Sequence, residues 1–224
     1  MINSWKLCAA SWQRNPEWRS HPIEVCLLNK KRAAEVSRKT KETEITVKLG
    51  LDGKGESRIA TGIHFFDHML TLFAKHGLFD VEIACTGDLE VDGHHTVEDV
   101  GIALGEAFHK ALGSKEGITR YGTAYVPMDE TLGRTVVDFS GRPYLVCNAE
   151  FPSEKVGAMS TELVEEFFRA LAVHARVNLH VEVLYGKNSH HMAEAMFKSA
   201  ARAFCIAVTK DPRVAGIPST KGVL

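Results

Sequence analysis

Two stretches of the sequence decide the fold: VEIACTGDLEVDGHHTVEDVGIALGEAF at residues 81–108 and VEVLYGKNSHHMAEAMFKSAARAF at residues 181–204. The second has a shorter loop. Otherwise both share Val-Glu, a His-His pair, a glutamate three residues after the pair, and a terminal Ala-Phe. Self-similarity of this kind indicates an internal duplication. We therefore expect an α+β protein made of two similar half-domains.

Hydrophobic periodicity along the chain predicts the same order of elements in both halves, strand–strand–helix–strand–helix. In the first half we expect strands at 44–49, 57–61 and 81–85, helices at 65–75 and 96–112, and a hairpin turn at 52–55. In the second half we expect strands at 123–128, 135–139, 142–149 and 179–183, and helices at 162–174 and 190–209. Sheets and helices should form layers, with the two sheets joined and the helices on one side.

Composition excludes some classes of protein. Lys and Arg number 27 against 28 Asp and Glu, and this balance argues against a nucleic-acid binder that works by bulk electrostatics. No apolar run approaches the roughly 20 residues of a membrane-spanning helix. Five scattered cysteines without a C-x-x-C suit a reducing compartment. We expect a cytoplasmic protein with neither nucleic-acid nor membrane partners.

The N-terminal stretch differs in texture from the rest. It holds all three tryptophans, Trp5, Trp12 and Trp18, and it lacks the apolar core and cleavage site of a secretory signal. We interpret residues 1–32 as an extension, poorly ordered or a start that is not used natively. Residues 33–224 then form one domain with repeat halves at about 33–120 and 121–224.

The motif that carries chemistry is H-H-x-x-E, at His94–Glu98 and again at His190–Glu194. Each copy opens a predicted helix, where positions three or four apart share a face. One histidine of each pair can therefore converge with the glutamate on a cation, while the other points elsewhere. We expect two metal centres, each with ligands from both motifs. Imidazole with carboxylate and no thiolate favours Mn²⁺, Fe²⁺, Co²⁺ or Zn²⁺.

Each half offers one more candidate ligand, a helix upstream of its motif. These are His68 in HFFDHML and Glu166 in VEEFFRAL. Lys198 lies four residues past Glu194, on the same face of the predicted helix. The remaining histidines lack such a context and are interpreted as structural or surface groups: His64, His76, His109, His174 and His180.

The sequence resembles the imidazoleglycerol-phosphate dehydratase family of histidine biosynthesis. The matching segments, in the family's order, are RKTKET (38–43), FFDHML (65–70), DGHHTVEDVGIALGEA (92–107), MDE (128–130), SGRPY (140–144), VEEFFRA (164–170), GKNSHHMAEAMFK (186–198) and IPSTKG (217–222). They run from about residue 33 to residue 224, and residues 1–32 fall outside them.

The resemblance implies a fold of the ribosomal protein S5 domain 2-like type and a reaction, the conversion of imidazole glycerol phosphate to imidazole acetol phosphate and water. It also implies two Mn²⁺ ions per subunit and trimers assembled into a shell of 24 subunits. The implied metal ligands are His68, His94, His95, Glu98, Glu166, His190, His191 and Glu194. Many members have histidine where this chain has Glu166, and a carboxylate can also ligate Mn²⁺.

The resemblance further assigns Glu42 to the substrate site, where we expect it to act as general acid and base. The implied phosphate-binding residues are Arg120, Arg142, Lys198, Ser219, Thr220 and Lys221. Arginine offers a bidentate fork and lysine a point charge to such a group.

Two other classes fit part of the pattern. A dinuclear metallohydrolase acting on a phosphorylated small molecule would use the same ligands to activate water, and the basic residues together with the resemblance favour dehydration. A ferritin-like storage protein would need four long helices and E-x-x-H spacing, whereas this chain has H-x-x-E and many predicted strands.

Overall fold

A computed structural model describes residues 32–224. The first half contains three strands, a helix, a strand and a second helix. These are β1 (Ala33–Lys39), β2 (Thr43–Gly50), β3 (Ser57–Ala60), α3 (His64–Gly77), β4 (Asp80–Gly87) and α4 (His94–Leu112). Burial alternates from Thr43 to Val47 in β2, as the sequence predicts for a strand with one apolar face, and the rest of β2 is buried throughout.

The second half repeats this order, with one small hairpin inserted. Its elements are β5 (Tyr121–Met128), β6 (Thr131–Asp138), β7 (Tyr144–Asn148), the hairpin β8 (Lys155–Val156) and β9 (Met159–Ser160), α5 (Glu162–Ala175), β10 (Asn178–Tyr185) and α6 (Ser189–Val208). The sheet orders β1-β2-β4-β3 and β5-β6-β10-β7 are equivalent. The duplicated, layered α+β fold is therefore confirmed. The first half has three strands before its first helix instead of the two expected, because β1 was not predicted, and the second half has the three expected strands and the added hairpin.

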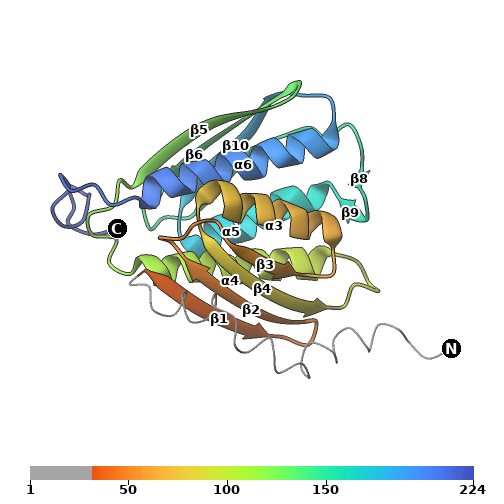
Figure 1. Cartoon of the computed structure of the whole chain (residues 1–224), viewed down its shortest axis with the longest axis horizontal. Coiled ribbons are helices and arrows are strands. Elements are labelled where there is room, and N and C mark those ends of the chain that lie inside the picture. Colours follow the sequence, from red (N-terminus) through yellow and green to blue (C-terminus); the bar gives the residue numbers. More distant parts are fainter. Residues whose placement is uncertain (1–31) are drawn as a thin grey trace.

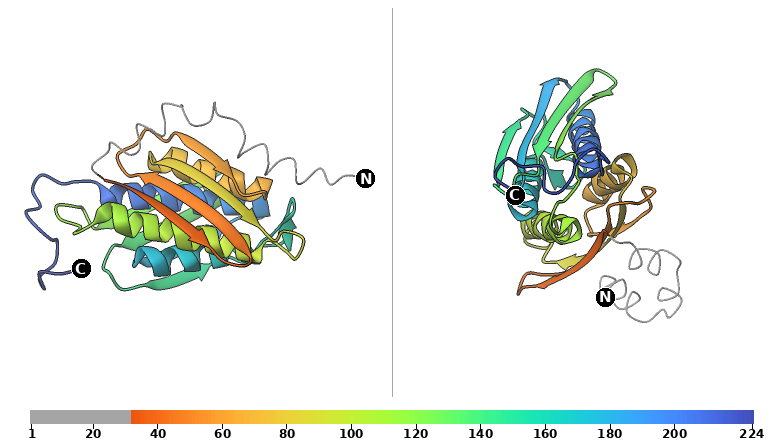
Figure 2. Two further views of the ribbon diagram at one scale, coloured as in Figure 1. Left: turned by 90° about the horizontal axis from the view of Figure 1, so that it is seen from below. Right: turned by 90° about the vertical axis from the view of Figure 1, so that its left-hand side faces the viewer.

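The expectation of joined sheets with helices on one side is wrong. The two four-stranded sheets are separate and form the outer layers, and the four helices lie between them (Figures 1 and 2). Helix α4 packs on β1 and β2 and also on α5, while α6 packs on β5 and β6 and also on α3. Each long helix therefore buries a second face against a helix of the other half.

Glycines on α4 allow this close helix packing. A Cβ added at Gly101 would lie 2.9 Å from the carbonyl oxygen of Phe167, and one at Gly105 would lie 2.8 Å from the backbone nitrogen of Ala175. Contacts this short would push the helices apart. Any residue larger than glycine at these two positions would therefore disrupt the α4–α5 interface.

The turn at 52–55 does not close a hairpin, which corrects the sequence interpretation. Strand β3 pairs in parallel with β4, and β4 lies between β3 and β2. The carboxylate of Asp80, the first residue of β4, accepts hydrogen bonds from the backbone N–H groups of Lys54 (2.8 Å) and Glu56 (3.1 Å). These bonds tie the loop to β4 and direct β3 to its far side.

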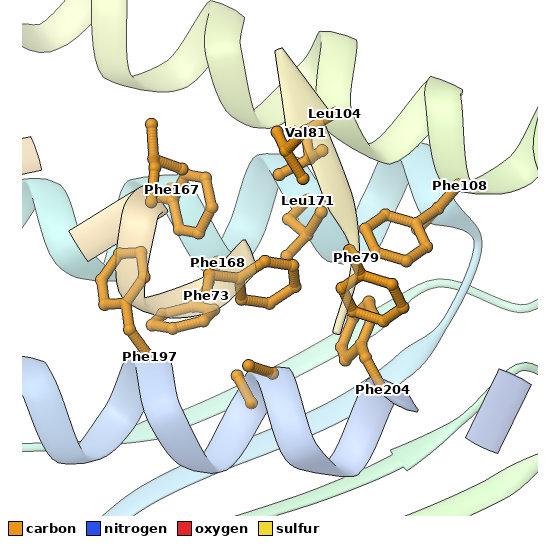
Figure 3. Packing of buried hydrophobic residues seen from close by; sticks show 14 of the residues in the cluster. Phe73, Phe79, Val81, Leu104, Phe108, Phe167, Phe168, Leu171, Phe197 and Phe204 are labelled. Atoms are coloured by element: carbon orange, nitrogen blue, oxygen red, sulfur yellow. The ribbon is translucent and has the colours of Figure 1, made fainter. Parts of the chain in front are cut away.

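Phenylalanines from both halves fill the core between the helices (Figure 3). The ring of Phe108 on α4 lies 5.1 Å from that of Phe79 and 5.2 Å from that of Phe204 on α6, both edge-on. Phe167 on α5 stacks on Phe197 on α6 at 5.0 Å. Buried aromatic pairs of this kind add to the hydrophobic gain, so the halves share one core.

The arrangement places all four helix N-termini at one end of the molecule and the C-terminal tail at the other (Figure 1). Two separate sheets around a helical centre are incompatible with a ferritin-like four-helix bundle. Within residues 32–224, the structure contains no helix that is both long enough and apolar enough to cross a membrane.

Candidate metal centre

Three side chains of types that can bind a metal converge from α3 and α6 at the end where the helices begin. His68 Nε2 lies 2.9 Å from Glu194 Oε1, and His190 Nε2 lies 3.1 Å from the same oxygen. One donor atom from each of these three residues lies within 4.8 Å of the other two. Two imidazole nitrogens and a carboxylate oxygen form a donor set that fits Mn²⁺, Fe²⁺, Co²⁺ or Zn²⁺.

Glu194 is the buried centre of this cluster, with 6% of its surface exposed. Its second oxygen accepts a hydrogen bond from Lys198 Nζ at 2.6 Å, one turn further along α6. Burial alone would raise the pKa of Glu194, but hydrogen bonds from Lys198, His68 and His190 outweigh it and lower the pKa to about 2. The carboxylate is therefore ionised and available to a cation at neutral pH.

Side chains accept hydrogen bonds from the first backbone N–H groups of both motif helices: Asn188 is the N-cap of α6, and Asp92 lies just before Gly93, the N-cap of α4. Asn188 Oδ1 accepts from the backbone N–H groups of His190 (2.9 Å) and His191 (3.4 Å), and Asp92 Oδ1 accepts from that of His94 (2.7 Å). The rings of His190 and His191 are inclined at 85° to each other, and those of His94 and His95 at 89°. Within one subunit, His190 faces Glu194, whereas His191 contacts Glu130.

The first motif forms a looser arrangement within one subunit. His94 Nε2 lies 4.0 Å from Glu98 Oε2, and Glu166 Oε2 lies 3.5 Å from the guanidinium of Arg169. Helices α3 and α5 are equivalent in the duplication, so Glu166 is the counterpart of His68. Among the described residues of one subunit, the three-ligand group takes its motif residues from the second motif.

The second histidine of each motif contacts a carboxylate that the sequence interpretation did not single out. His95 Nδ1 lies 3.0 Å from Asp88 Oδ2, and His191 Nδ1 lies 2.7 Å from Glu130 Oε2. The hydrogen bond to Asp88 raises the pKa of His95, and the one to Glu130 raises the pKa of His191. The duplication could have identified Glu130 as a candidate site residue, because it immediately precedes β6 just as Glu42 immediately precedes β2.

Glu42 lies in the turn between β1 and β2, with its side chain about half exposed and its Oε1 3.9 Å from His95 Nε2. Hydrogen bonds to α4 hold this turn in place: Asp99 on α4 accepts from Thr43 Oγ1 (2.5 Å) and from Arg38 Nε (2.9 Å). Asp99 is buried and belongs to the first motif helix. The contacts thus link the position of Glu42 to the histidines at the start of α4.

The expected phosphate-binding residues do not lie together. Lys198 is beside the metal cluster, whereas the backbone N–H of Arg120 donates to the carbonyl of Ala207 at the far end of α6. Arg120 also donates to the carbonyl of Pro218, so Ser219, Thr220 and Lys221 are at that end too. Gly141 lies against Leu224, the last residue of the tail, which places the adjacent Arg142 there as well.

A hollow beside the second motif is lined by residues of the β8–β9 hairpin and of the loop before α6. Its lining includes Glu130, Lys155, Lys187, Ser189, His190 and His191. The hollow places polar groups and two cations, Lys155 and Lys187, next to the histidines of the second motif.

Comparisons with known proteins agree on one family. The sequence model of imidazoleglycerol-phosphate dehydratase matches residues 61–204. Two dehydratases of that name, from Acetivibrio thermocellus and Thermoanaerobacter pseudethanolicus, are 60% and 61% identical to this chain over 193 residues. The aligned residues make up 86% of this chain and 99% and 100% of those relatives.

Solved structures of the same family have the same fold. The imidazoleglycerol-phosphate dehydratase of Staphylococcus aureus superposes with a TM-score of 0.73 at 44% identity, covering 80% of this chain and 99% of the other. The enzyme of Pyrococcus furiosus also gives 0.73, at 39% identity, covering 84% of this chain and all of its own.

Proposed function

Since the chain belongs to the imidazoleglycerol-phosphate dehydratase family of hydro-lyases, we propose that it converts D-erythro-imidazole glycerol phosphate to imidazole acetol phosphate and water in histidine biosynthesis. The observation that carries this proposal is the group of His68, His190 and Glu194 beside Lys198. It combines a cation site with a positive charge suited to a phosphorylated substrate. We expect the enzyme to work in the cytoplasm.

The metal is Mn²⁺, with two ions per subunit. The ligands are those that the resemblance implies: His68, His94, His95, Glu98, Glu166, His190, His191 and Glu194. When bound, the ions supply Lewis acidity and a template for the imidazole ring. The mixed nitrogen and oxygen donors, together with the ionised Glu194, support this assignment.

Glu42 moves protons in the reaction. Dehydration to the acetol removes the hydroxyl group from the carbon attached to the imidazole ring and a proton from the neighbouring carbinol carbon, and the resulting enol regains a proton at the ring-attached carbon, so a group that accepts and returns a proton is needed. Glu42 is half exposed and faces His95 from a turn held by Asp99 and Thr43. An exposed carboxylate on a fixed support can reach a bound substrate.

Phosphate is held by Arg120, Arg142, Lys198, Ser219, Thr220 and Lys221. Because five of these lie at the end of the subunit away from the metal cluster, a complete site needs both ends from different copies of the chain. We therefore propose a homo-oligomer, with 24 subunits built from trimers, in which subunits meet end to end at the sites.

A direct assay tests the function. Purified protein with Mn²⁺ and imidazole glycerol phosphate is expected to form imidazole acetol phosphate, and elemental analysis is expected to find two Mn²⁺ per subunit. Release of inorganic phosphate without formation of the ketone would contradict the proposal and would favour a metallohydrolase.

A further inference from the structure

The second histidine of each motif has a carboxylate on its Nδ1 side. The partners are Asp88, in the loop between β4 and α4, and Glu130, in the turn between β5 and β6. A neutral imidazole carries one N–H, and a carboxylate next to Nδ1 holds that proton there. Nε2 then keeps its lone pair and is the nitrogen left to bind a metal.

Glu130 is itself anchored. Its Oε1 accepts hydrogen bonds from the backbone N–H groups of Lys187 (3.2 Å) and Asn188 (2.9 Å), while Oε2 contacts His191. The hydrogen bond to His191, followed by those from the backbone, lowers the pKa of Glu130 to about 2. One carboxylate thus joins the turn, the loop before α6 and the imidazole.

The two carboxylates are not counterparts in the duplication. The counterpart of Glu130 is Glu42, which lies 3.9 Å from the other ring nitrogen of His95. The counterpart of the Asp88 loop is residues 186–188, Gly-Lys-Asn, which contains no acid. Each half therefore supplies its carboxylate from a different loop to the same atom of the equivalent histidine. Common ancestry of the halves does not explain why both histidines have a carboxylate at Nδ1. A need for a hydrogen-bond acceptor at Nδ1 of both histidines does explain it.

We propose that Asp88 and Glu130 are positioning residues that fix His95 and His191 with Nδ1 protonated and Nε2 available as a metal ligand. This inference rests on the metal centres of the proposed function. Outer carboxylates of this kind orient ligand histidines, and their loss typically lowers metal affinity by about 10- to 100-fold.

Asp88 gives the cleaner test, because both of its carboxylate oxygens contact His95 Nδ1, whereas the carboxylate of Glu130 also accepts hydrogen bonds from two backbone N–H groups. Mn²⁺ affinity is measured on wild type, Asp88→Ala and Asp88→Asn from the electron paramagnetic resonance signal of free aqueous Mn²⁺. Asn keeps an oxygen that can accept from Nδ1–H, whereas Ala does not. We expect a loss of about 10- to 100-fold in Asp88→Ala and a much smaller loss in Asp88→Asn. Glu90→Ala, on an exposed residue of the same loop, is the matched control and should bind like wild type.

The outcomes separate the inference from the function on which it rests. Unchanged Mn²⁺ affinity in Asp88→Ala would overturn the positioning role and leave wild-type dehydration untouched. Equal losses in Asp88→Asn and Asp88→Ala would also overturn it, because charge and not the Nδ1 acceptor would then be responsible. Wild-type protein that binds no Mn²⁺ would overturn the metal centres and this inference together. The same comparison of Mn²⁺ affinity can be made in the second half with Glu130→Gln and Glu130→Ala.

Discussion

Arg120 donates a hydrogen bond from Nη1 to the carbonyl oxygen of Pro218 at 2.9 Å. Its Nε and Nη2 hold the two carboxylate oxygens of Asp138, so the guanidinium joins the C-terminal tail to β6. This junction lies where α6 ends, whereas His190 lies where α6 begins. At 1.5 Å per residue the two ends are about 25 Å apart, too far for one small substrate to touch both in one subunit.

Inactive variants from the two ends should therefore complement each other. Arg120→Ala and His190→Ala are each expected to lose turnover. Co-expressed in equal amounts, they should form mixed oligomers in which about a quarter of the sites combine an intact metal end with an intact tail end. The control is His190→Ala with Glu194→Gln, which damages one end twice and should restore nothing. Mixed oligomers without activity would show that sites are not shared between copies.

The duplication explains why much of this fold was predictable from the sequence. Periodicity located the long helices, and the motif at His190 begins α6 in the structure as it does in the prediction. The pairing of β3 with β4 was not predictable, because it depends on Asp80 contacting a loop about 25 residues earlier. The central position of the helices was missed because a stripe of small residues, such as Gly101 and Gly105, indicates close packing without naming the partner.

The candidate site was predictable only in part, for a similar reason. Motif spacing placed His190 and Glu194 on one face, since that relation is local to a helix. The contacts of Asp88 with His95 and of Glu130 with His191 depend on how loops meet, so spacing alone could not show them. The separation of Arg120 from the metal motifs likewise follows only from the parallel packing of the helices.

Replacement of Glu42 by Gln should slow the reaction without emptying the site. Glu42→Gln keeps the size of the side chain and removes its ability to take up a proton, so kcat should fall by about 10²-fold or more. Mn²⁺ content and KM should change little, because the carboxylate lies 3.9 Å from His95 and outside the His68–His190–Glu194 group. Steady-state kinetics with elemental analysis measures both. An unchanged kcat would assign the proton transfer to another group.

Histidines inside and outside the motifs should respond differently to truncation. His95→Ala and His191→Ala are expected to abolish turnover and to lower the bound metal, because each removes a ligand. His109→Ala, near the end of α4, should do neither. Burial, with the nearby Arg176 and Lys115, lowers the pKa of His109, which marks it as a neutral structural group. Full metal content and activity in both motif variants would exclude the site.

Deletion of residues 1–31 should leave the activity and the assembly of the enzyme unchanged. Residues 1–31 lie outside the described residues, and the interpretation of 1–32 as an extension comes from the sequence alone. Arg32, however, contacts both carboxylate oxygens of Asp52 and the carbonyl of Val208. A cut after residue 31 should preserve activity and oligomeric mass. A cut after residue 32 should lower the melting temperature slightly. Loss of assembly with the first cut would give the extension a structural role.

Metal binding and assembly should rise and fall together, because a site completed by a second subunit does not exist in smaller species. The metal needs deprotonated imidazole, and contacts with Asp88 and Glu130 raise the pKa of His95 and His191 above 6.5. Protons should therefore begin to displace Mn²⁺ above pH 6.5, and the oligomer should dissociate toward trimers as the pH falls further. In the metal-free protein, a raised histidine pKa means that the protonated ring is stabilised by its contact with the carboxylate. This stabilisation of the fold is fully present below pH 6.5 and is lost as the pH rises through the raised pKa values. The metal-free trimers should therefore stay folded near pH 6.

Size-exclusion chromatography with light scattering checks this, on protein treated with chelator, on protein at pH 6, and after Mn²⁺ is restored at neutral pH. We expect loss of both mass and activity in the first two samples and recovery of both in the third. Circular dichroism distinguishes dissociation from unfolding. A metal-free preparation that keeps the full 24-subunit mass would refute metal-linked assembly. It would leave the dehydratase reaction standing, because a preformed shell could still take up its metals.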